Sequence, residues 1–303
     1  MKIGLIGLGK MGANLAMNFK DHQHEVIGYD LSEAACESIA EKGIQVAKDM
    51  DDLIAKLDKP RVLWLMLPCG GPMDSTIDAL SEKLAADDIV IDGGNSRYTD
   101  SMQHAKICAN KQIRFLDCGT SGGVSGARNG ACLMVGGDKS AFDVVKDALA
   151  DVAVDQGMTY TGKAGSGHFM KMVHNGIEYG MMQAIGEGFQ LMKESGFDYD
   201  LVEVAKNWNH GSVIHGWLME IVQSQLEKDP DLADVVGEVD ASGEAKWTVE
   251  TALEKNISMP VTALSLMVRS ASKDQEKFSS KMVAVMRNGF GGHNVKKKEN
   301  VYE

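Results

Sequence analysis

The sequence has few cysteines and prolines, fewer basic than acidic residues, and no long apolar run. Its 303 residues include five cysteines and five prolines. The cysteines show no C-x-x-C pair, so we expect neither a disulfide framework nor a zinc site. A reducing cytoplasm is the expected location, and the N-terminal residues show no cleavable signal pattern. The longest apolar runs, such as 62–67, are far too short to span a membrane.

Acidic residues outnumber basic ones by 43 to 31, which gives a net charge of −12. Nucleic-acid and membrane-surface binding both need a basic face, so we expect neither kind of partner. An anionic substrate would need positive charges gathered locally. The hydrophobic fraction of 44% and the charged fraction of 24% are typical of a globular protein and exclude a disordered or collagen-like chain.

Two patterns meet near residue 164. Before it, short strand patterns alternate with helical ones, which is typical of a parallel sheet covered by helices on both faces. After it, helical patterns follow at roughly 166–195, 199–208, 213–228, 247–256 and 260–288. We therefore expect a doubly wound α/β domain over 1–164 and an all-α domain over 165–303. The predicted strands are 2–6, 25–29, 61–67, 88–92, 113–117, 131–135 and 158–161.

A glycine-rich loop, G-L-G-K-M-G at 7–12, follows the first predicted strand, and Asp30 ends the second. The glycines allow a tight turn, the approach of a pyrophosphate and close helix packing, as in a Rossmann-type dinucleotide site. Asp30 can bind a ribose 2′-hydroxyl and would repel a 2′-phosphate, so NAD is expected in preference to NADP. A glycine turn without a ligand is the less favoured alternative. The predicted cofactor residues are Gly7, Leu8, Gly9, Lys10, Met11, Gly12, Asp30, Leu67, Pro68 and Asn95.

The helical pattern at 166–195 is apolar around most of its circumference, so we expect a buried helix whose methionines fill the core. Five polar residues interrupt it within an arc of about 140°. Lys171 and Glu178 are seven positions apart, too far for an ordinary direct pair. That spacing suits a base and an acid on opposite sides of a bound molecule. The alternative is an internal network that only stabilises the core. The five residues are Lys171, His174, Asn175, Glu178 and Tyr179.

Three other segments carry glycine or polar residues where a ligand could bind. D-G-G-N-S at 92–96 follows a predicted strand at its carboxyl end, where open parallel sheets bind ligands. The predicted loop at 119–127 offers backbone N–H groups to an anion. Either segment alone could be an ordinary turn. Arg269 and the run R-N-G-F-G-G-H at 287–293 supply cations that would suit a phosphate if they converge.

Together GLGKMG, DGGNS, SGGVSGA, KMVHNGIEYG, KWT and RNGFGGH resemble the motifs of 6-phosphogluconate dehydrogenase (decarboxylating), in the same order. The resemblance implies oxidation and decarboxylation of 6-phosphogluconate to ribulose 5-phosphate, with Lys171 as base, Glu178 as acid and no metal. It also implies a homo-oligomer, a tetramer or else a dimer, in which a neighbouring subunit supplies the C-terminal Arg and His. The implied sugar-acid residues are Asn95, Ser121, Gly122, Gly123, His174 and Asn175, and the implied phosphate residues are Tyr179, Arg269, Arg287 and His293.

The sequence departs from the family pattern in three ways. The chain is shorter than the common long form and resembles a short-chain branch. Asp-Leu-Ser at 30–32 stands where the long form has Asn-Arg-Thr, which agrees with NAD. Ser242 stands where the long form has a substrate-binding Lys, which puts phosphate recognition in question.

Two other functions stay open from sequence. One is a related dehydrogenase acting on an unphosphorylated hydroxy acid, which Ser242 favours and the C-terminal cations oppose. The other is a non-catalytic NAD sensor, which has no need of a matched base and acid such as Lys171 and Glu178.

Overall fold

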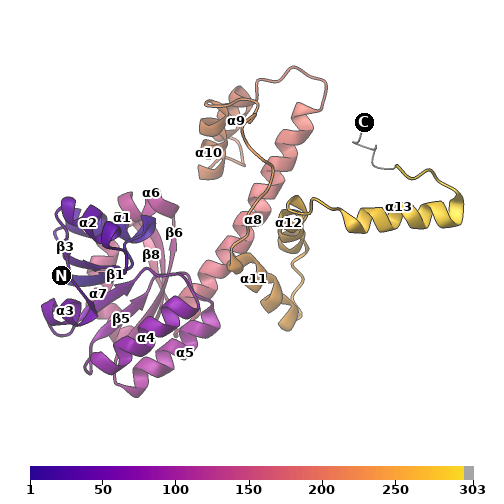
Figure 1. The fold of residues 1–303 in the computed structure, drawn as a ribbon. Coiled ribbons are helices and arrows are strands. Elements are labelled where there is room, and N and C mark those ends of the chain that lie inside the picture. The colour runs from indigo at the N-terminus through magenta and orange to yellow at the C-terminus, as the bar shows by residue number, and fades with distance from the viewer. Residues whose placement is uncertain (297–303) are drawn as a thin grey trace. The chain divides into compact units, whose positions relative to one another are not determined.

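The computed structural model describes residues 1–296, which form two compact units (Figure 1). The first unit comprises Met1–Glu178 and Gly243–Ser258, and the second comprises Tyr179–Ser242 and the described residues from Met259 onward. Strands give way to helices where the sequence predicts, because the last strand ends at Gly162 and a helix begins at Ser166. The compact units divide later, within that helix, so the domain boundary at 164 stays a prediction. The end of the predicted helical domain, 297–303, lies outside the described residues.

An eight-stranded sheet forms the centre of the first unit, in the order β3-β2-β1-β4-β5-β6-β7-β8. The strand order reverses between β1 and β4, which is the switch point of a doubly wound sheet. The strands are β1 (Lys2–Ile6), β2 (Glu25–Tyr29), β3 (Gln45–Val46), β4 (Val62–Leu65), β5 (Ile89–Asp92), β6 (Arg114–Ser121), β7 (Ala131–Gly137) and β8 (Ala153–Gly162).

Helices cover both faces of the sheet, because its strands are apolar on both sides. Alternate residues of β4 pack against opposite faces of the sheet. Trp64 packs into the first helix layer, and Leu63 and Leu65 pack into the second. The first layer contains α1 (Lys10–Asp21), α2 (Glu33–Glu41), α6 (Gly123–Asn129) and α7 (Lys139–Asp151), and the second contains α3 (Met50–Lys56), α4 (Gly71–Lys83) and α5 (Tyr98–Asn110).

One strand pair differs from the parallel sheet that the sequence predicts. β6 and β7 are antiparallel, with Ser121 opposite Cys132 and Leu116 opposite Gly137. Residues 122–130 join them, fewer than the dozen or so that a parallel crossover needs. The pairing extends β6 to Ser121. The predicted loop at 119–127 is therefore wrong in part, because 119–121 belong to a strand and α6 begins at Gly123.

The remaining elements are helices, and none within 1–296 combines the length and apolar character that a membrane crossing requires. The predicted helix over 260–288 is two helices, because the chain leaves helical geometry before Lys277, whose φ is +49°. The helices are α8 (Ser166–Lys193), α9 (Leu201–Asn209), α10 (Trp217–Leu226), α11 (Gly243–Glu254), α12 (Pro260–Ser272) and α13 (Phe278–Gly291).

The expectation that the whole of α8 is buried is wrong for the single chain. Met172 is buried, but Met170 and Met181 are about half exposed, and Leu191 is 72% exposed. An apolar face of this kind needs a covering surface. Periodicity in the sequence predicts which residues avoid water but does not reveal whether the same chain covers them.

Candidate active site

The loops after β1, β4 and β5 surround a cleft of about 650 Å³ in the first unit. It lies beside the switch point, outside the carboxyl ends of the strands, where open α/β sheets bind ligands. Every predicted cofactor residue except Leu8 lines it. Leu8 instead packs its side chain into the first helix layer.

The three glycines of the 7–12 loop occupy different environments. Gly7 has φ +95°, and a Cβ there would lie 2.3 Å from the Met66 carbonyl oxygen. A Cβ on Gly12 would lie 1.9 Å from the Gly7 oxygen, so α1 can pack this closely only with glycine. Gly9 caps α1 without a side-chain bond, and among the described residues no atom lies within 4 Å of its Cβ position. The free N–H groups of the helix are therefore open to an anion.

Asp30 and Lys10 carry the charges among the residues that line the cleft. The Asp30 carboxylate accepts hydrogen bonds from Leu8 N at 2.6 Å and from Ser32 N at 2.8 Å. These bonds fix its orientation, and each carboxylate oxygen keeps a further lone pair for a hydroxyl donor. One end of the cleft can therefore bind a diol.

The other end of the cleft is built from Asn95 and Thr120. Asn95 has a left-handed backbone, with φ +54°. Its Oδ1 accepts from Thr120 N at 3.0 Å and its Nδ2 donates to Thr120 O at 3.2 Å. The loop after β5 is thus bonded to the end of β6. Thr120 lies in the predicted 119–127 segment but is not among the site residues named from sequence, because it reaches the cleft only at the end of the extended β6.

Lys171 lies beside β6 because the start of α8 is anchored there. The buried Asp117 carboxylate accepts from Gly165 N at 2.6 Å and His168 N at 2.8 Å, so an anion satisfies the helix N-terminus. A Cβ on Gly119 would lie 2.5 Å from Lys171 Cβ. Lys171 therefore packs against the residue next to Thr120, at the end of the cleft.

The Lys171 side chain is nearly buried, with 6% of the residue exposed. Its ammonium has no hydrogen-bond or ion-pair partner within 1–296. Burial lowers the pKa of Lys171 below its ordinary value, and the charges of Glu178 and Glu244 offset part of that shift. Sequence reasoning missed Glu244. It stands in the first turn of α11, which packs on α8 through a bond from Thr248 Oγ1 to the Met172 oxygen.

Three other predicted polar residues of α8, His174, Asn175 and Glu178, form a connected group. His174 Nε2 lies 3.2 Å from Ser121 Oγ, and its Nδ1 lies 2.9 Å from Asn175 Oδ1 and 3.8 Å from Glu178 Oε2. The side chains of His174 and Glu178 are each 38% exposed, so this group faces solvent and is not sealed in a core. Gly122 and Gly123, both with positive φ, follow Ser121 and lead from β6 into α6.

The second unit brings together Tyr179, Ser242 and Arg269. The Arg269 guanidinium lies 3.4 Å from the centre of the Tyr179 ring and donates to the Asp240 oxygen at 3.0 Å. Tyr179 Oη accepts from Ser242 N at 2.8 Å and lies 3.0 Å from Ser242 Oγ.

Arg287 on α13 and His293 beyond it are exposed. In the described part of the chain, no hydrogen bond or ring contact joins either of them to Tyr179 or Arg269. Their predicted role at a phosphate therefore stays a prediction. Across residues 1–296, no group of three or more His, Cys, Asp or Glu side chains could hold a metal ion.

The doubly wound sheet, the uncapped glycine turn and the cleft at the switch point define a dinucleotide-binding protein of Rossmann type. Family models identify the group more closely. Residues 2–162 match the NAD binding domain of 6-phosphogluconate dehydrogenase, and residues 167–302 match the C-terminal domain of that enzyme. The chain therefore belongs to the 6-phosphogluconate dehydrogenase family.

Individual relatives agree with this assignment. YqeC of Bacillus subtilis is 48% identical over 98% of this chain and all of its own length. A 6-phosphogluconate dehydrogenase of Haloferax volcanii, named as NAD(+)-dependent and decarboxylating, is 42% identical over 99% of this chain and all of its own. The structure of Plasmodium falciparum 6-phosphogluconate dehydrogenase is similar with a TM-score of 0.84 and 33% identity. That match covers 99% of this chain and 67% of the Plasmodium chain.

Proposed function

We propose that this protein oxidises and decarboxylates 6-phosphogluconate to ribulose 5-phosphate and CO2, with reduction of NAD. The observation that carries the proposal is the position of Lys171. It is nearly buried, its pKa is lowered by burial, and it packs against Gly119 at the end of a dinucleotide cleft. An amine with a lowered pKa is deprotonated in a larger fraction of molecules than an exposed lysine, so it is better able to accept a proton.

Lys171 would act as the general base on the C3 hydroxyl of the sugar acid. Bound NAD supplies a hydride acceptor at C3. The protonated Lys171 would then donate a hydrogen bond to the new C3 carbonyl oxygen, which draws electrons toward C3 as the C1 carboxylate leaves as CO2. Glu178 and Glu244, which both act electrostatically on Lys171, favour its protonated form during this step.

Glu178 would supply the proton that completes the reaction, at the carbon that carried the lost carboxylate and that becomes C1 of ribulose 5-phosphate. It lies one helical turn beyond His174, whose imidazole is 3.8 Å from the Glu178 carboxylate. Ser121, His174, Asn175 and Asn95 would hold the sugar hydroxyls and carboxylate, with Gly122 and Gly123 offering backbone N–H groups.

NAD is the proposed cofactor, in preference to NADP. Asp30 presents a carboxylate whose two oxygens are oriented by Leu8 N and Ser32 N, in a cleft where Lys10 is the one cation among the described lining residues. A 2′-phosphate beside this carboxylate would be repelled, whereas a 2′-hydroxyl can donate to it. The Haloferax relative named as NAD(+)-dependent supports the same choice.

The phosphate of the substrate would bind near Tyr179 and Arg269 in the second unit, with Arg287 and His293 contributed by a neighbouring subunit. The Ser242 N–H donates a hydrogen bond to the Tyr179 hydroxyl, and the Ser242 hydroxyl lies within hydrogen-bond distance of the same oxygen. We also propose a homo-oligomer, a tetramer or else a dimer. The exposed apolar residues of α13, among them Phe278 and Phe290, support it because an isolated helix of this length is marginally stable in water.

The test is the absorbance of the reduced nicotinamide, measured with 6-phosphogluconate or gluconate and with NAD or NADP in parallel. We expect a rise with 6-phosphogluconate and NAD that exceeds the rise with NADP, together with release of CO2. Faster oxidation of gluconate than of 6-phosphogluconate would mean that the substrate is an unphosphorylated acid. Binding of NAD without turnover of either acid would mean that the protein is a sensor.

A further inference from the structure

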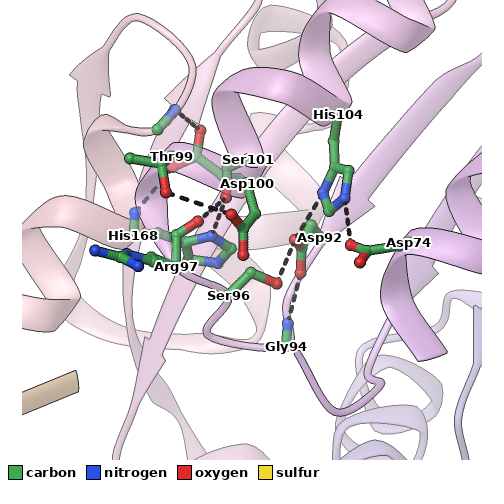
Figure 2. Close-up of polar contacts among 12 residues, drawn as sticks. Asp74, Asp92, Gly94, Ser96, Arg97, Thr99, Asp100, Ser101, His104 and His168 are labelled. Carbon is green, nitrogen blue, oxygen red and sulfur yellow. Dashed lines mark hydrogen bonds and ion pairs between the residues drawn. The ribbon is translucent and has the colours of Figure 1, made fainter. Parts of the chain in front are cut away.

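A buried histidine lies between two carboxylates behind the cleft. His104 is on α5 and is 4% exposed. Its Nε2 is 2.9 Å from Asp74 Oδ1, and its Nδ1 is 3.9 Å from Asp92 Oδ2 (Figure 2). Asp74 belongs to the first turn of α4 and Asp92 to the end of β5, so one imidazole joins two elements that are separate in the sequence.

Each carboxylate supports a different wall of the cleft. Asp92 Oδ1 accepts from Gly94 N at 3.0 Å, and its Oδ2 accepts from Ser96 Oγ at 2.7 Å, so Asp92 bonds to both neighbours of Asn95 (Figure 2). Asp74 is fixed at the start of α4 beside Pro72, Ser75 and Thr76, and these three residues also line the cleft.

The charges in this cluster favour a protonated imidazole. Asp92 is fully buried, and a buried carboxylate is costly without a cation nearby. Burial opposes protonation of His104, but Asp92 and Asp74 outweigh it and raise the pKa of His104 above its ordinary 6.5. The other groups that face the pair are the Phe115 ring of β6, edge to face with the imidazole, and His168 of α8, whose charge helps to lower the pKa of Asp92.

The contacts of His104 with Asp74 and Asp92 would affect the position of Asn95. Its backbone is left-handed, a conformation that asparagine adopts more readily than other residues with a side chain and that the surrounding hydrogen bonds hold in place. Its side chain is held by Thr120 on one side, and its two neighbours are held by Asp92 on the other. A shift of Asp92 would therefore move the polar group at the end of the dinucleotide cleft.

We propose that His104 in its cationic form is a positioning residue: it joins Asp92 to Asp74 and so keeps the Asn95 loop and the start of α4 at the separation that NAD requires. The inference rests on the proposed function in one respect, that the cleft binds NAD. It predicts that affinity for NAD falls as the pH rises through the pKa of His104, because the neutral imidazole no longer attracts both carboxylates.

The experiment measures the Kd for NAD without substrate, from about pH 6 to about pH 9.5, for the wild type, His104→Gln and His104→Lys. We expect His104→Gln to bind NAD roughly tenfold more weakly at pH 7 and with little pH dependence, as for the loss of a charged hydrogen bond. His104→Lys, which stays charged, should bind more tightly than His104→Gln and keep its affinity to about pH 9. His22→Gln, an exposed histidine of the same unit, is the matched control and should follow the wild type.

Thermal unfolding of each variant separates positioning from a structural role. The proposal would be overturned if His104→Gln melts at a lower temperature but, where it is folded, binds NAD with the affinity and the pH dependence of the wild type. A wild-type affinity that does not vary with pH would overturn it as well. If the wild type binds NAD but does not oxidise 6-phosphogluconate, the proposed function fails, and the positioning role is still judged on NAD affinity alone.

Discussion

At the scale of single residues, the site keeps an amine where few water molecules can reach it. Lys171 is nearly buried without a hydrogen-bond partner in the described chain, and its pKa is lowered by burial. A group with a lowered amine pKa in the folded state opposes folding at every pH below its unfolded pKa, about 10.5. At neutral pH the wild type should therefore be less stable than a variant with an uncharged side chain at position 171.

Lys171→Met should abolish turnover. It should also raise the melting temperature, by about 2 °C or more for each kcal/mol added to the free energy of unfolding. Calorimetry at pH 7 and the nicotinamide assay check the two effects. Lys193→Met, at the exposed end of the same helix, should change neither by much. In the wild type, kcat/KM should rise with pH through the pKa of Lys171, because the base must be deprotonated. A loss of stability in Lys171→Met would contradict this account.

Glu178→Gln tests the proposed acid. The side chain is partly exposed, so the amide should be tolerated and the melting temperature should change little. Formation of ribulose 5-phosphate should fall by about two orders of magnitude or more, the usual contribution of general acid catalysis. Product analysis by chromatography measures this. Wild-type product formation by the variant would remove Glu178 from the acid role.

Asp30→Ala tests the choice of cofactor. Removing the carboxylate takes away both the acceptor for a ribose hydroxyl and the repulsion of a 2′-phosphate. The Kd for NAD should rise by roughly tenfold, as for one charged hydrogen bond, while the Kd for NADP should rise less or fall. Fluorescence titration with both cofactors gives the ratio. An unchanged NAD-to-NADP ratio would refute the ribose contact.

At the scale of elements, the position of Lys171 depends on how closely α8 approaches β6. Gly119 allows that approach, since a methyl group there would lie 2.5 Å from Lys171 Cβ and 3.0 Å from the Gly167 oxygen. The anchor at the start of the helix is Asp117, which accepts two backbone N–H groups. Helix and strand therefore cannot separate without breaking buried hydrogen bonds.

Gly119→Ala should displace Lys171 and cost about 1–3 kcal/mol of folding stability, the usual range for overpacking. Denaturant unfolding measures the cost, and kcat should fall more than KM rises because the displaced residue is the base. Gly188→Ala is the matched control in α8, where no atom of residues 1–296 lies within 4 Å of the added methyl. It should be neutral or stabilising. Equal effects of the two substitutions would contradict the close-approach argument.

At the scale of the whole molecule, a large apolar area of the helical part is exposed in the single chain. α13 has no buried residue, and Val283 and Met286 are each about half exposed. Exposed apolar faces of this extent are typical of interfaces. The proposed association of several copies would cover them.

The protein should sediment as a species larger than its 32.7 kDa chain mass. Val283→Glu should weaken the association, because it would bury a carboxylate in the interface. Ser280→Glu, on an exposed polar position of the same helix, is the control and should sediment closer to the wild type. Sedimentation velocity over a range of concentrations measures both. A monomeric wild type at micromolar concentration would refute association through this face.

The sequence by itself determined the features that depend on neighbouring residues. The alternation of strands and helices, the glycine turn at 7–12 and the position of Asp30 at the end of β2 could all be predicted. Hydrophobic periodicity and turn chemistry act over a few residues, so they can be read from the chain directly. The motif order gave the family for the same reason, because each motif is a short segment.

Only the tertiary structure decided which distant residues meet. The antiparallel β6–β7 pair placed Thr120 at the cleft, and the packing of α11 on α8 brought the charge of Glu244 to bear on Lys171. The bridge from Asp74 through His104 to Asp92 spans three elements. The sequence also did not reveal that apolar residues of α8 and α13 are exposed in the single chain. Such contacts depend on how whole elements pack, and a single sequence records the residues of each element but not their distances in space.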